Sequence, residues 1–327
     1  MMNRRDLLKY GAAGLSAATL QPTAAQAYPD RAVRLVVPFS PGGATDVVGR
    51  LWAERMKQLL GTVVVENKGG GGGVIGATEV ARSQPDGHTF LFGNTSTQVL
   101  IPAIAKQPAY DPLKDFTAIY ILCVSPTSIV VHESVPARTL QELIAYAKAN
   151  PRKLSYGSAG TGTMTNLAGE LFKQLIGAPD IVHVPYKGSA PGVADLASGH
   201  IPMMTPNVGG PLLDFHRMGK IRILAVASEK RLKVAPEIPT AIEAGLPGML
   251  AANFNGLFGP AGIPKAIVDQ IANATRTAMQ DESFQKPMIA SGFEPLLDSG
   301  PTAAQHMVAD ELARWTPIMQ ATGFKVE

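Results

Sequence analysis

The sequence predicts an α/β fold in which mostly parallel sheets are flanked by helices. Short apolar runs alternate along the chain with longer segments of helical periodicity, and this alternation is typical of strand–helix–strand units. Hydrophobic residues make up 46% of the 327 residues, which is enough to form a large core and more than one domain. One strand–loop–helix unit also occurs twice in similar form, and this echo favours two similar lobes.

The expected strands are apolar runs bounded by glycine, proline or polar residues. Such runs fit strands that are covered on both faces, because a half-exposed strand would alternate apolar and polar residues. In chain order the expected strands are Val33–Phe39, Val63–Glu66, Thr89–Phe92, Ala118–Val124, Ser128–Val131, Leu154–Gly157, Ile181–Val184 and Ile221–Ala227.

The expected helices have apolar residues at helical spacing and recognisable ends. In the first, Val47, Leu51, Met56 and Leu59 recur near that spacing, and Gly61 stands at the C-cap position. In chain order the expected helices are Asp46–Leu60, Gly76–Ser83, Leu140–Ala149 (preceded by Thr139 and followed by Pro151), Asn166–Ile176, Ala190–Ser198, Ile267–Gln280 and Thr302–Thr322.

The internal repeat consists of Leu35–Gly61 and Leu154–Gly177, which have similar sequences. The first unit reads LVVPFSPGGATD and its helix ends in KQLLG; the second reads LSYGSAGTGTMTN and its helix ends in KQLIG. A match this short also arises by chance. If it is real, each lobe presents one helix N-terminus to a shared cleft.

Charge and cysteine content exclude several classes of function. The formal net charge is +3, and no basic stripe with interleaved aromatic residues is present, so we expect no nucleic-acid partner. The single cysteine, Cys123, lies in an apolar run and excludes an intramolecular disulfide or a multi-cysteine zinc site. We expect it to be a buried small hydrophobic residue rather than a reactive thiol.

The N-terminus has the features of an export signal. Arg4, Arg5 and Lys9 form a basic region, a short weakly apolar stretch follows, and Ala25–Ala27 fits an A-x-A cleavage site. The sequence predicts a signal peptide over residues 1–27, cleaved after Ala27, and an exported protein. The adjacent arginines favour the twin-arginine route over the general secretory route, although Leu7 stands where that pattern most often has Phe.

Two glycine-containing loops between a strand and a helix are candidate anion sites. They are Ser40–Thr45 and Gly160–Thr163, and the second adds threonine hydroxyls. Free N–H groups of a helix's first turn, together with the helix dipole, favour a bound carboxylate. The alternative for each loop is an ordinary strand–helix turn, with Asp46 as a first-turn acid in the first.

Gly71–Gly76 matches the G-x-G-x-x-G pattern of dinucleotide-binding proteins. The match is weak, because a run of five glycines satisfies many glycine templates and Phe92-Gly93-Asn94 stands where an acid would end the following strand. Other catalytic motifs are missing, and the six histidines lack metal-ligand spacing. We therefore expect no enzyme, no cofactor and no metal, with a dinucleotide-dependent oxidoreductase as a minor alternative.

Ordered segments along almost the whole mature chain resemble the substrate-binding proteins of tripartite tricarboxylate transporters, the Bug or TctC-like family. None of these segments is specific alone, but their number and order are. They are Tyr28–Arg31, Pro38–Asp46, Val65–Lys68, Pro85–His88, Tyr156–Glu170, Val184–Ser189, Leu224–Lys230, Pro239–Gly248 and Gly259–Pro264.

The resemblance implies a periplasmic protein with the two-lobed Venus-flytrap fold, which delivers a small organic carboxylate to membrane permease subunits. We expect a monomer with lobe 1 over residues 28–127 plus 248–327 and lobe 2 over 128–247. A periplasmic partner of a signalling receptor remains an alternative. The expected ligand-binding residues are Phe39, Ser40, Gly42, Gly43, Ala44, Thr45, Asp46, Thr95, Gly160, Thr161, Gly162, Thr163, Asn207 and Phe254.

The chain departs from the family pattern around this expected pocket. The family often has Ser at Thr163, His at Asn166 and Trp at Phe254, and it often has Asp-Met-Met-Phe-Asp-Asn where this chain has Pro202–Asn207. The identity of the carboxylate therefore does not transfer with the resemblance.

Overall fold

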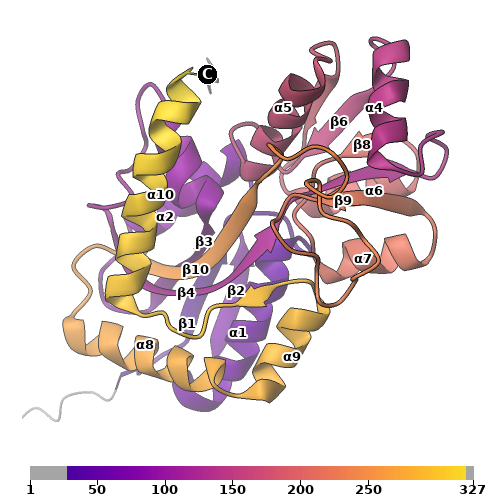
Figure 1. The fold of residues 1–327 in the computed structure, drawn as a ribbon. Coiled ribbons are helices and arrows are strands. Elements are labelled where there is room, and N and C mark those ends of the chain that lie inside the picture. Colours follow the sequence, from indigo (N-terminus) through magenta and orange to yellow (C-terminus); the bar gives the residue numbers. More distant parts are fainter. Residues whose placement is uncertain (1–27, 322–327) are drawn as a thin grey trace, which may run out of the picture.

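The computed structural model describes residues 28–321, which form two lobes around two separate sheets (Figure 1). The predicted signal peptide lies outside the described residues. Sheet one has the strand order β11-β4-β10-β3-β1-β2, and sheet two has the order β7-β6-β8-β5-β9. Lobe 1 denotes sheet one with its helices, and lobe 2 denotes sheet two with its helices.

The strands of lobe 1 are β1 (Val33–Val37), β2 (Val63–Asn67), β3 (Thr89–Asn94), β4 (Phe116–Pro126), β10 (Ala252–Pro260) and β11 (Glu294–Pro295). Those of lobe 2 are β5 (Ser128–His132), β6 (Ser155–Ser158), β7 (Val182–Pro185), β8 (Met203–Met204) and β9 (Ile221–Val226).

The helices of lobe 1 are α1 (Ala44–Leu60), α2 (Val74–Ala81), α3 (Ile101–Ile104), α8 (Lys265–Met279), α9 (Glu282–Ala290) and α10 (Pro301–Ala321), with the short helical segments η1 (Gly71–Gly73) and η2 (Ser96–Leu100). Those of lobe 2 are α4 (Leu140–Ala149), α5 (Met164–Ile176), α6 (Ser189–Ala197) and α7 (Gly210–Arg217). None of the helices in residues 28–321 has the length and apolar character needed to cross a membrane.

The two sheets share one topology. In lobe 1, β1 pairs in parallel with β2 and β3. In lobe 2, β6 pairs in parallel with β7 and β8. Beside these strands, β10 runs antiparallel to both of its neighbours, β3 and β4. In the other sheet, β5 likewise runs antiparallel to both β8 and β9. The prediction of two α/β lobes with sheets flanked by helices is confirmed. Both sheets are mixed: β1–β4 run in one direction in sheet one and β6–β9 in sheet two, with β10 and β5 as antiparallel strands between them.

The antiparallel part of sheet one exists because the chain crosses between the lobes twice. β4 runs out of lobe 1 into β5, and β10 returns beside β4 in the opposite direction. This return strand was not predicted, since Asn253, Asn255 and Gly256 are residue types that strands usually avoid. The paired segments of β4 and β10 nearest lobe 2, Cys123–Pro126 and Ala252–Asn255, are called the crossing ribbon below.

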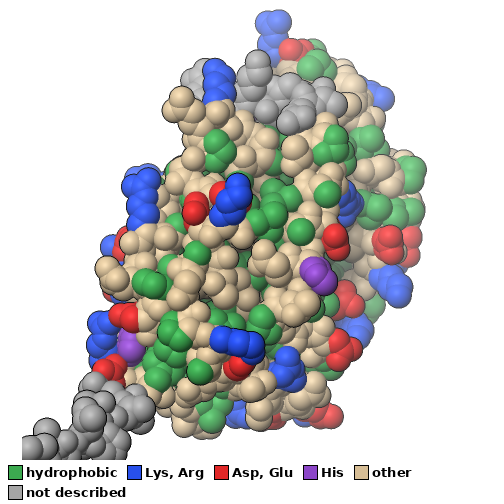
Figure 2. Space-filling view, turned by 90° about the vertical axis from the view of Figure 1, so that its left-hand side faces the viewer, with side chains coloured by type: hydrophobic (Ala, Val, Ile, Leu, Met, Phe, Trp, Pro, Cys, Tyr) green, Lys and Arg blue, Asp and Glu red, His purple; other side chains and the backbone are tan. Residues whose placement is uncertain are grey.

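Helices cover both faces of each sheet, and the alternation of side chains along the strands explains the layers. In β1, Val33, Leu35 and Val37 pack in one hydrophobic cluster with α1 and α8, whereas Val36 packs in another cluster with α2 and α10. In lobe 2, α4 and α5 cover one face and α6 and α7 the other. The face of the molecule in Figure 2 carries Lys, Arg, Asp and Glu side chains interspersed, without a large patch of one sign.

Cys123 lies on β4 with no exposed surface, so the prediction of a buried small hydrophobic residue is confirmed. Burial raises the pKa of its thiol far above the usual value, because the charged thiolate loses its solvation. We expect no reaction of the native protein with a disulfide reagent such as Ellman's reagent at pH 8, and one reactive thiol after unfolding in urea. Rapid labelling of the folded protein would contradict the burial of this strand.

Candidate functional site

The two glycine-containing loops have the same backbone geometry. Gly42 has φ +83° and Gly162 has φ +79°, a left-handed conformation that glycine adopts without strain. The Gly42 N–H donates to Oδ2 of Asp46 at 2.8 Å, and the Gly162 N–H donates to Oδ1 of Asn166 at 3.0 Å. In each loop, a side chain in the first turn of the helix thus holds the glycine four residues earlier. The echo in the sequence therefore corresponds to equivalent loops, one in each lobe.

The first turn of α1 offers backbone N–H groups that have no partner in the part of the chain that the structure describes. Gly43 is the N-cap and provides no side-chain cap. The N–H groups of Gly43, Ala44 and Thr45 have no hydrogen-bond acceptor within residues 28–321. The Asp46 carboxylate does not serve them, because it accepts hydrogen bonds from Gly42, Arg50 and Asn67. Asp46, one of the expected ligand-binding residues, thus braces the loop.

The first turn of α5 is more fully satisfied than that of α1. The hydroxyl of Thr163 donates to the Gly160 carbonyl at 2.6 Å and accepts from the Asn166 N–H at 3.3 Å. The Met164 N–H donates to Oγ of Ser96, a residue of lobe 1, at 3.0 Å. Because the single Thr163 proton is already used, Thr163 caps its helix and is not a free hydroxyl donor for a ligand.

A small cavity of about 20 Å³ lies between the two helix starts and is called the cleft cavity. Its wall contains both helix starts and the ends of strands from both lobes, and no charged side chain. A helix N-terminus in such surroundings attracts an anion through N–H groups and its dipole alone. The lining residues are Phe39, Gly43, Ala44, Thr45, Asn94, Ser96, Ala159, Thr163, Thr165, Ser189 and Asn207.

Six of the predicted site residues line the cleft cavity, namely Phe39, Gly43, Ala44, Thr45, Thr163 and Asn207. Ser40, Gly42, Asp46, Gly160, Thr161 and Gly162 belong to the same loops but do not line it, while Thr95 and Phe254 line another cavity. The sequence analysis missed Asn94, Ser96, Ala159, Thr165 and Ser189. The sequence did contain a signal for Asn94 and Ser96, which are polar residues at the carboxyl end of the buried strand β3. Parallel sheets bind ligands at this edge, so both residues could have been predicted to lie at the site.

A buried polar network fixes the first loop to the sheet. The hydroxyl of Thr45 donates to Oδ1 of Asn255 at 2.9 Å and accepts from Nδ2 of Asn94 at 3.0 Å. Asn94 ends β3 and Asn255 lies on β10, and neither side chain is more than 3% exposed. The position of the α1 N-terminus is therefore set by β3 and the crossing ribbon together. Buried amides of this kind are stable only when they are hydrogen-bonded.

The lobes touch beside the cleft cavity through backbone groups. The Ser40 N–H of lobe 1 donates to the Lys187 carbonyl of lobe 2 at 3.2 Å. Gly72, in the run that matched the dinucleotide pattern, packs against the Thr161 backbone, and a Cβ there would lie 2.8 Å from the Thr161 oxygen. This glycine thus permits close approach of the two lobes, which accounts for part of the glycine run without a phosphate site.

His183 on β7 supports the second loop through its contacts with Tyr156 and Ser158. Its ring stacks on Tyr156 at 4.9 Å, and Nε2 lies 2.7 Å from Oγ of Ser158. Burial lowers the pKa of His183; Lys173 lowers it further, and Glu170 acts in the opposite direction. The unfolded chain therefore binds this proton at a higher pH than the folded protein does.

We expect the free energy of unfolding to decrease as the pH falls below about 6.5, towards the lowered pKa of folded His183. Urea unfolding at pH 7.5 and 5.5 measures this loss, which should be smaller in His183→Gln. An equal loss in both proteins would assign the pH dependence to other groups.

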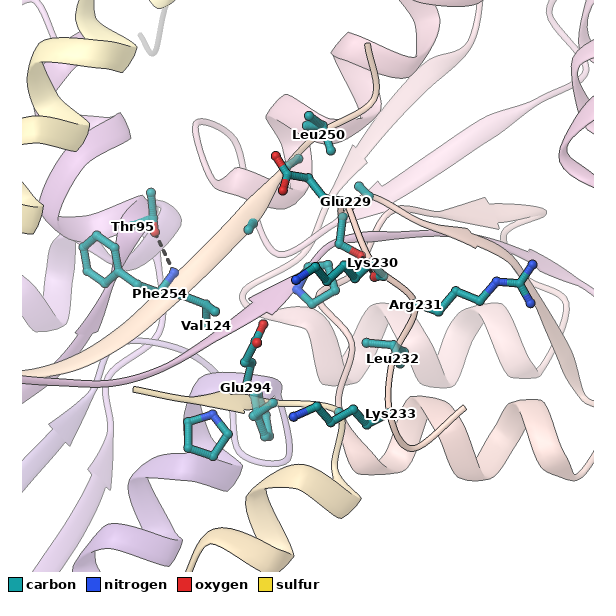
Figure 3. Close-up of a pocket in the computed structure, with 18 of the residues that line it drawn as sticks. Thr95, Val124, Glu229, Lys230, Arg231, Leu232, Lys233, Leu250, Phe254 and Glu294 are labelled. Carbon is teal, nitrogen blue, oxygen red and sulfur yellow. Dashed lines mark hydrogen bonds between the residues drawn. The ribbon is translucent and has the colours of Figure 1, made fainter. Parts of the chain in front are cut away.

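A second, larger cavity of about 610 Å³ lies on the other face of the crossing ribbon (Figure 3). Val124 and Pro126 of β4 and Phe254 of β10 line it, whereas the intervening Asn255 faces Thr45 and the cleft. Because successive side chains of a strand point to opposite faces, the ribbon separates the two cavities. The larger one, called the hinge-side cavity, is also lined by Ala227–Val234 of lobe 2 and by Phe293–Pro295 and Trp315 of lobe 1.

Two mixed sheets joined by crossing strands, with facing helix starts between them, are the architecture of a two-lobed binding protein. The family model of the tripartite tricarboxylate transporter family receptor, TctC, matches residues 48–324. The chain belongs to this family. It is a periplasmic solute-binding protein of the TctC family and not an enzyme, so the dinucleotide alternative is wrong.

Relatives of known sequence and structure agree with this assignment. The protein BugT of Bordetella pertussis is 32% identical over 309 residues, 94% of each chain. The structure of the periplasmic binding protein BugD has a TM-score of 0.87 and 35% identity, covering 92% of this chain and 100% of that one. MatC of Rhodopseudomonas palustris with bound malate has a TM-score of 0.84 and 32% identity, covering 89% and 99%. Rpa4515 of R. palustris with adipate has a TM-score of 0.85 and 35% identity, covering 91% and 99%.

Proposed function

We propose that this TctC-family protein captures one small organic carboxylate at the cleft cavity and delivers it, as a monomer, to the membrane permease of a tripartite tricarboxylate transporter. The cavity of about 20 Å³ has room for about one water molecule, so the lobes must separate beyond their present position to hold the acid. The observation that carries the proposal is the set of unpaired N–H groups at Gly43, Ala44 and Thr45, which face a cavity without charged side chains. A carboxylate accepts such hydrogen bonds, and each contributes roughly 1.5–3 kcal/mol. Relatives that bind malate and adipate support the ligand class.

In this proposal the two lobes close on the ligand about the crossing ribbon. The lobes comprise residues 28–127 with 248–327 and residues 128–247, and the ribbon joins them near Thr127. Lobe 1 supplies the N–H groups for the carboxylate, and lobe 2 covers it with Thr163, Ser189 and Asn207. Asn207 has a buried Oδ1 without a hydrogen-bond partner in residues 28–321, and a donor on the ligand would satisfy it.

A thermal-shift screen over small organic acids tests the proposal. Malate, adipate, succinate, citrate, aspartate and benzoate are compared with the corresponding uncharged amides. A ligand at 100 times its Kd stabilises the folded protein by about 2.7 kcal/mol, so a bound acid raises Tm and its amide does not. EDTA should leave the shift unchanged. If no acid of the panel raises Tm, or acids and amides act equally, the carboxylate proposal fails.

The proposal also includes export through the N-terminal signal. Mass spectrometry of the periplasmic protein should find Tyr28 at the N-terminus, because Ala25–Ala27 is the expected cleavage site. Replacing Arg4 and Arg5 with lysine should block export on the twin-arginine route. Unimpaired export of that variant would indicate the general secretory route, and a full-length cytosolic protein would contradict export.

A further inference from the structure

The hinge-side cavity contains charges of opposite sign on opposite lobes. Glu294 on β11 belongs to lobe 1, whereas Lys230 and Lys233 belong to the segment that follows β9 in lobe 2. Figure 3 shows both lysine side chains extending toward the crossing ribbon and β11, where Glu294 projects into the same space.

These three charged groups have no ion-pair partner within residues 28–321. Among their charged neighbours, Arg231 pairs with Glu243 at 2.7 Å and Arg314 with Glu311 at 3.3 Å, each within its own lobe. Glu229 of lobe 2, next to Lys230, also lines the cavity and has no ion pair within residues 28–321. Glu294 of lobe 1 and the two lysines of lobe 2 are thus unpaired charges of opposite sign on opposite sides of the cavity.

The position of these charges relative to the hinge decides when they can meet. The crossing ribbon lies between the cleft cavity and the hinge-side cavity, with Asn255 facing the first and Phe254 the second. In a hinge motion of two rigid lobes about this ribbon, opening one side narrows the other. Opening the cleft to admit or release a ligand would therefore bring Lys230 and Lys233 towards Glu294.

We propose that Glu294 pairs with Lys230 and Lys233 when the cleft opens, and that these contacts favour the open, ligand-free form. The proposal rests on the proposed function, in which the closed form holds the carboxylate. A contact present only in the open form lowers the apparent affinity, because the ligand must shift the equilibrium against it. Glu294 thereby sets the affinity and eases release to the permease without touching the ligand.

The first test is calorimetry with malate, or with the acid of highest affinity in the thermal-shift panel. Glu294→Gln should bind that acid about two- to fivefold more tightly than the wild type, the range expected for exposed ion pairs. Added salt should strengthen binding in the wild type, because it screens the open-state contacts, and this effect should be weaker in the variant. Glu282→Gln is the matched control: it is an exposed acid of lobe 1 on α9, away from the cavity, and should leave the affinity unchanged.

The second test is a double-mutant cycle between the charged residues on the two sides of the cavity. Lys230→Gln combined with Lys233→Gln should raise the affinity as Glu294→Gln does, and adding Glu294→Gln to the double variant should have no further effect. Small-angle scattering of the ligand-free proteins reads the lobe angle without any ligand. Glu294→Lys should be more compact than the wild type, because like charges then face each other across the hinge-side cavity.

Unchanged or weaker binding in Glu294→Gln, independent effects of the two sides, or an unchanged radius of gyration in Glu294→Lys would overturn the proposal. Failure of the proposed function would look different. In that case no acid binds to any variant, while the scattering of ligand-free Glu294→Lys still decides whether these charges hold the lobes apart.

Discussion

Replacing Ala44 with proline is expected to weaken carboxylate binding about 10- to 150-fold while the protein stays folded. The loss corresponds to one charge-assisted hydrogen bond of roughly 1.5–3 kcal/mol. Ala44 is the first residue of α1 and lines the cleft cavity, and its N–H has no acceptor in residues 28–321. Calorimetry with the acid identified in the thermal-shift panel measures the effect.

The backbone of the α1 start explains why the fold should tolerate this proline. Proline is favoured at the first helical position, where its missing N–H is not part of the helix ladder. The preceding residue, Gly43, is extended with ψ 167°, which suits a residue before proline. Ala44→Ser is the control, because it keeps the N–H and adds only a hydroxyl. Equal affinity of the proline and serine variants would mean that this N–H does not bind the carboxylate.

Replacing Gly69 with alanine is expected to lower the affinity about 5- to 150-fold by hindering closure of the lobes. A Cβ on Gly69 of lobe 1 would lie 2.9 Å from the carbonyl oxygen of Lys187 in lobe 2, the same oxygen that accepts from the Ser40 N–H. Overpacking of this kind costs about 1–3 kcal/mol. The Gly69 backbone is outside the left-handed region, so alanine causes no strain within lobe 1.

The strain from Gly69→Ala arises only when the lobes meet, so it should appear in the ligand affinity and not in the stability of the ligand-free protein. Small-angle scattering should show less compaction on ligand addition than in the wild type. Gly209→Ala is the matched control, since its Cβ would lie 3.7 Å from Ala44, an ordinary contact between the same two lobes. If Gly69→Ala binds and compacts normally, the contact between Ser40 and Lys187 is not part of the liganded form.

Local patterns predicted the elements that build the site. The apolar run before Ser40 is β1, the periodic segment after Asp46 lies in α1, and the repeated loop–helix unit corresponds to equivalent loops with Gly42 and Gly162 in the same conformation. These features depend on neighbouring residues alone: apolar periodicity, glycine where φ is positive, and a first-turn side chain that reaches back to the loop.

Several elements and roles could not be found in this way. β10 carries Asn253, Asn255 and Gly256, which are poor strand residues, yet Asn255 is fully buried because Thr45 on a distant helix hydrogen-bonds to it. β8 and β11 have two residues each, too few for a periodic signal. α9 contains Pro287 and lacks a clear helical pattern.

The sequence by itself determined the α/β character, the two glycine-containing strand–helix loops, the buried Cys123 and the family. Tertiary structure alone decided that both sheets are mixed, that Asp46 and Thr163 brace their loops, and that Phe254 faces the hinge-side cavity while Asn255 faces the cleft. The physical reason is the range of the interactions. Periodicity and loop conformation are set within a few residues, whereas strand direction, the partner of a buried polar group and the side on which a side chain lies depend on segments that meet only when the chain crosses between the lobes.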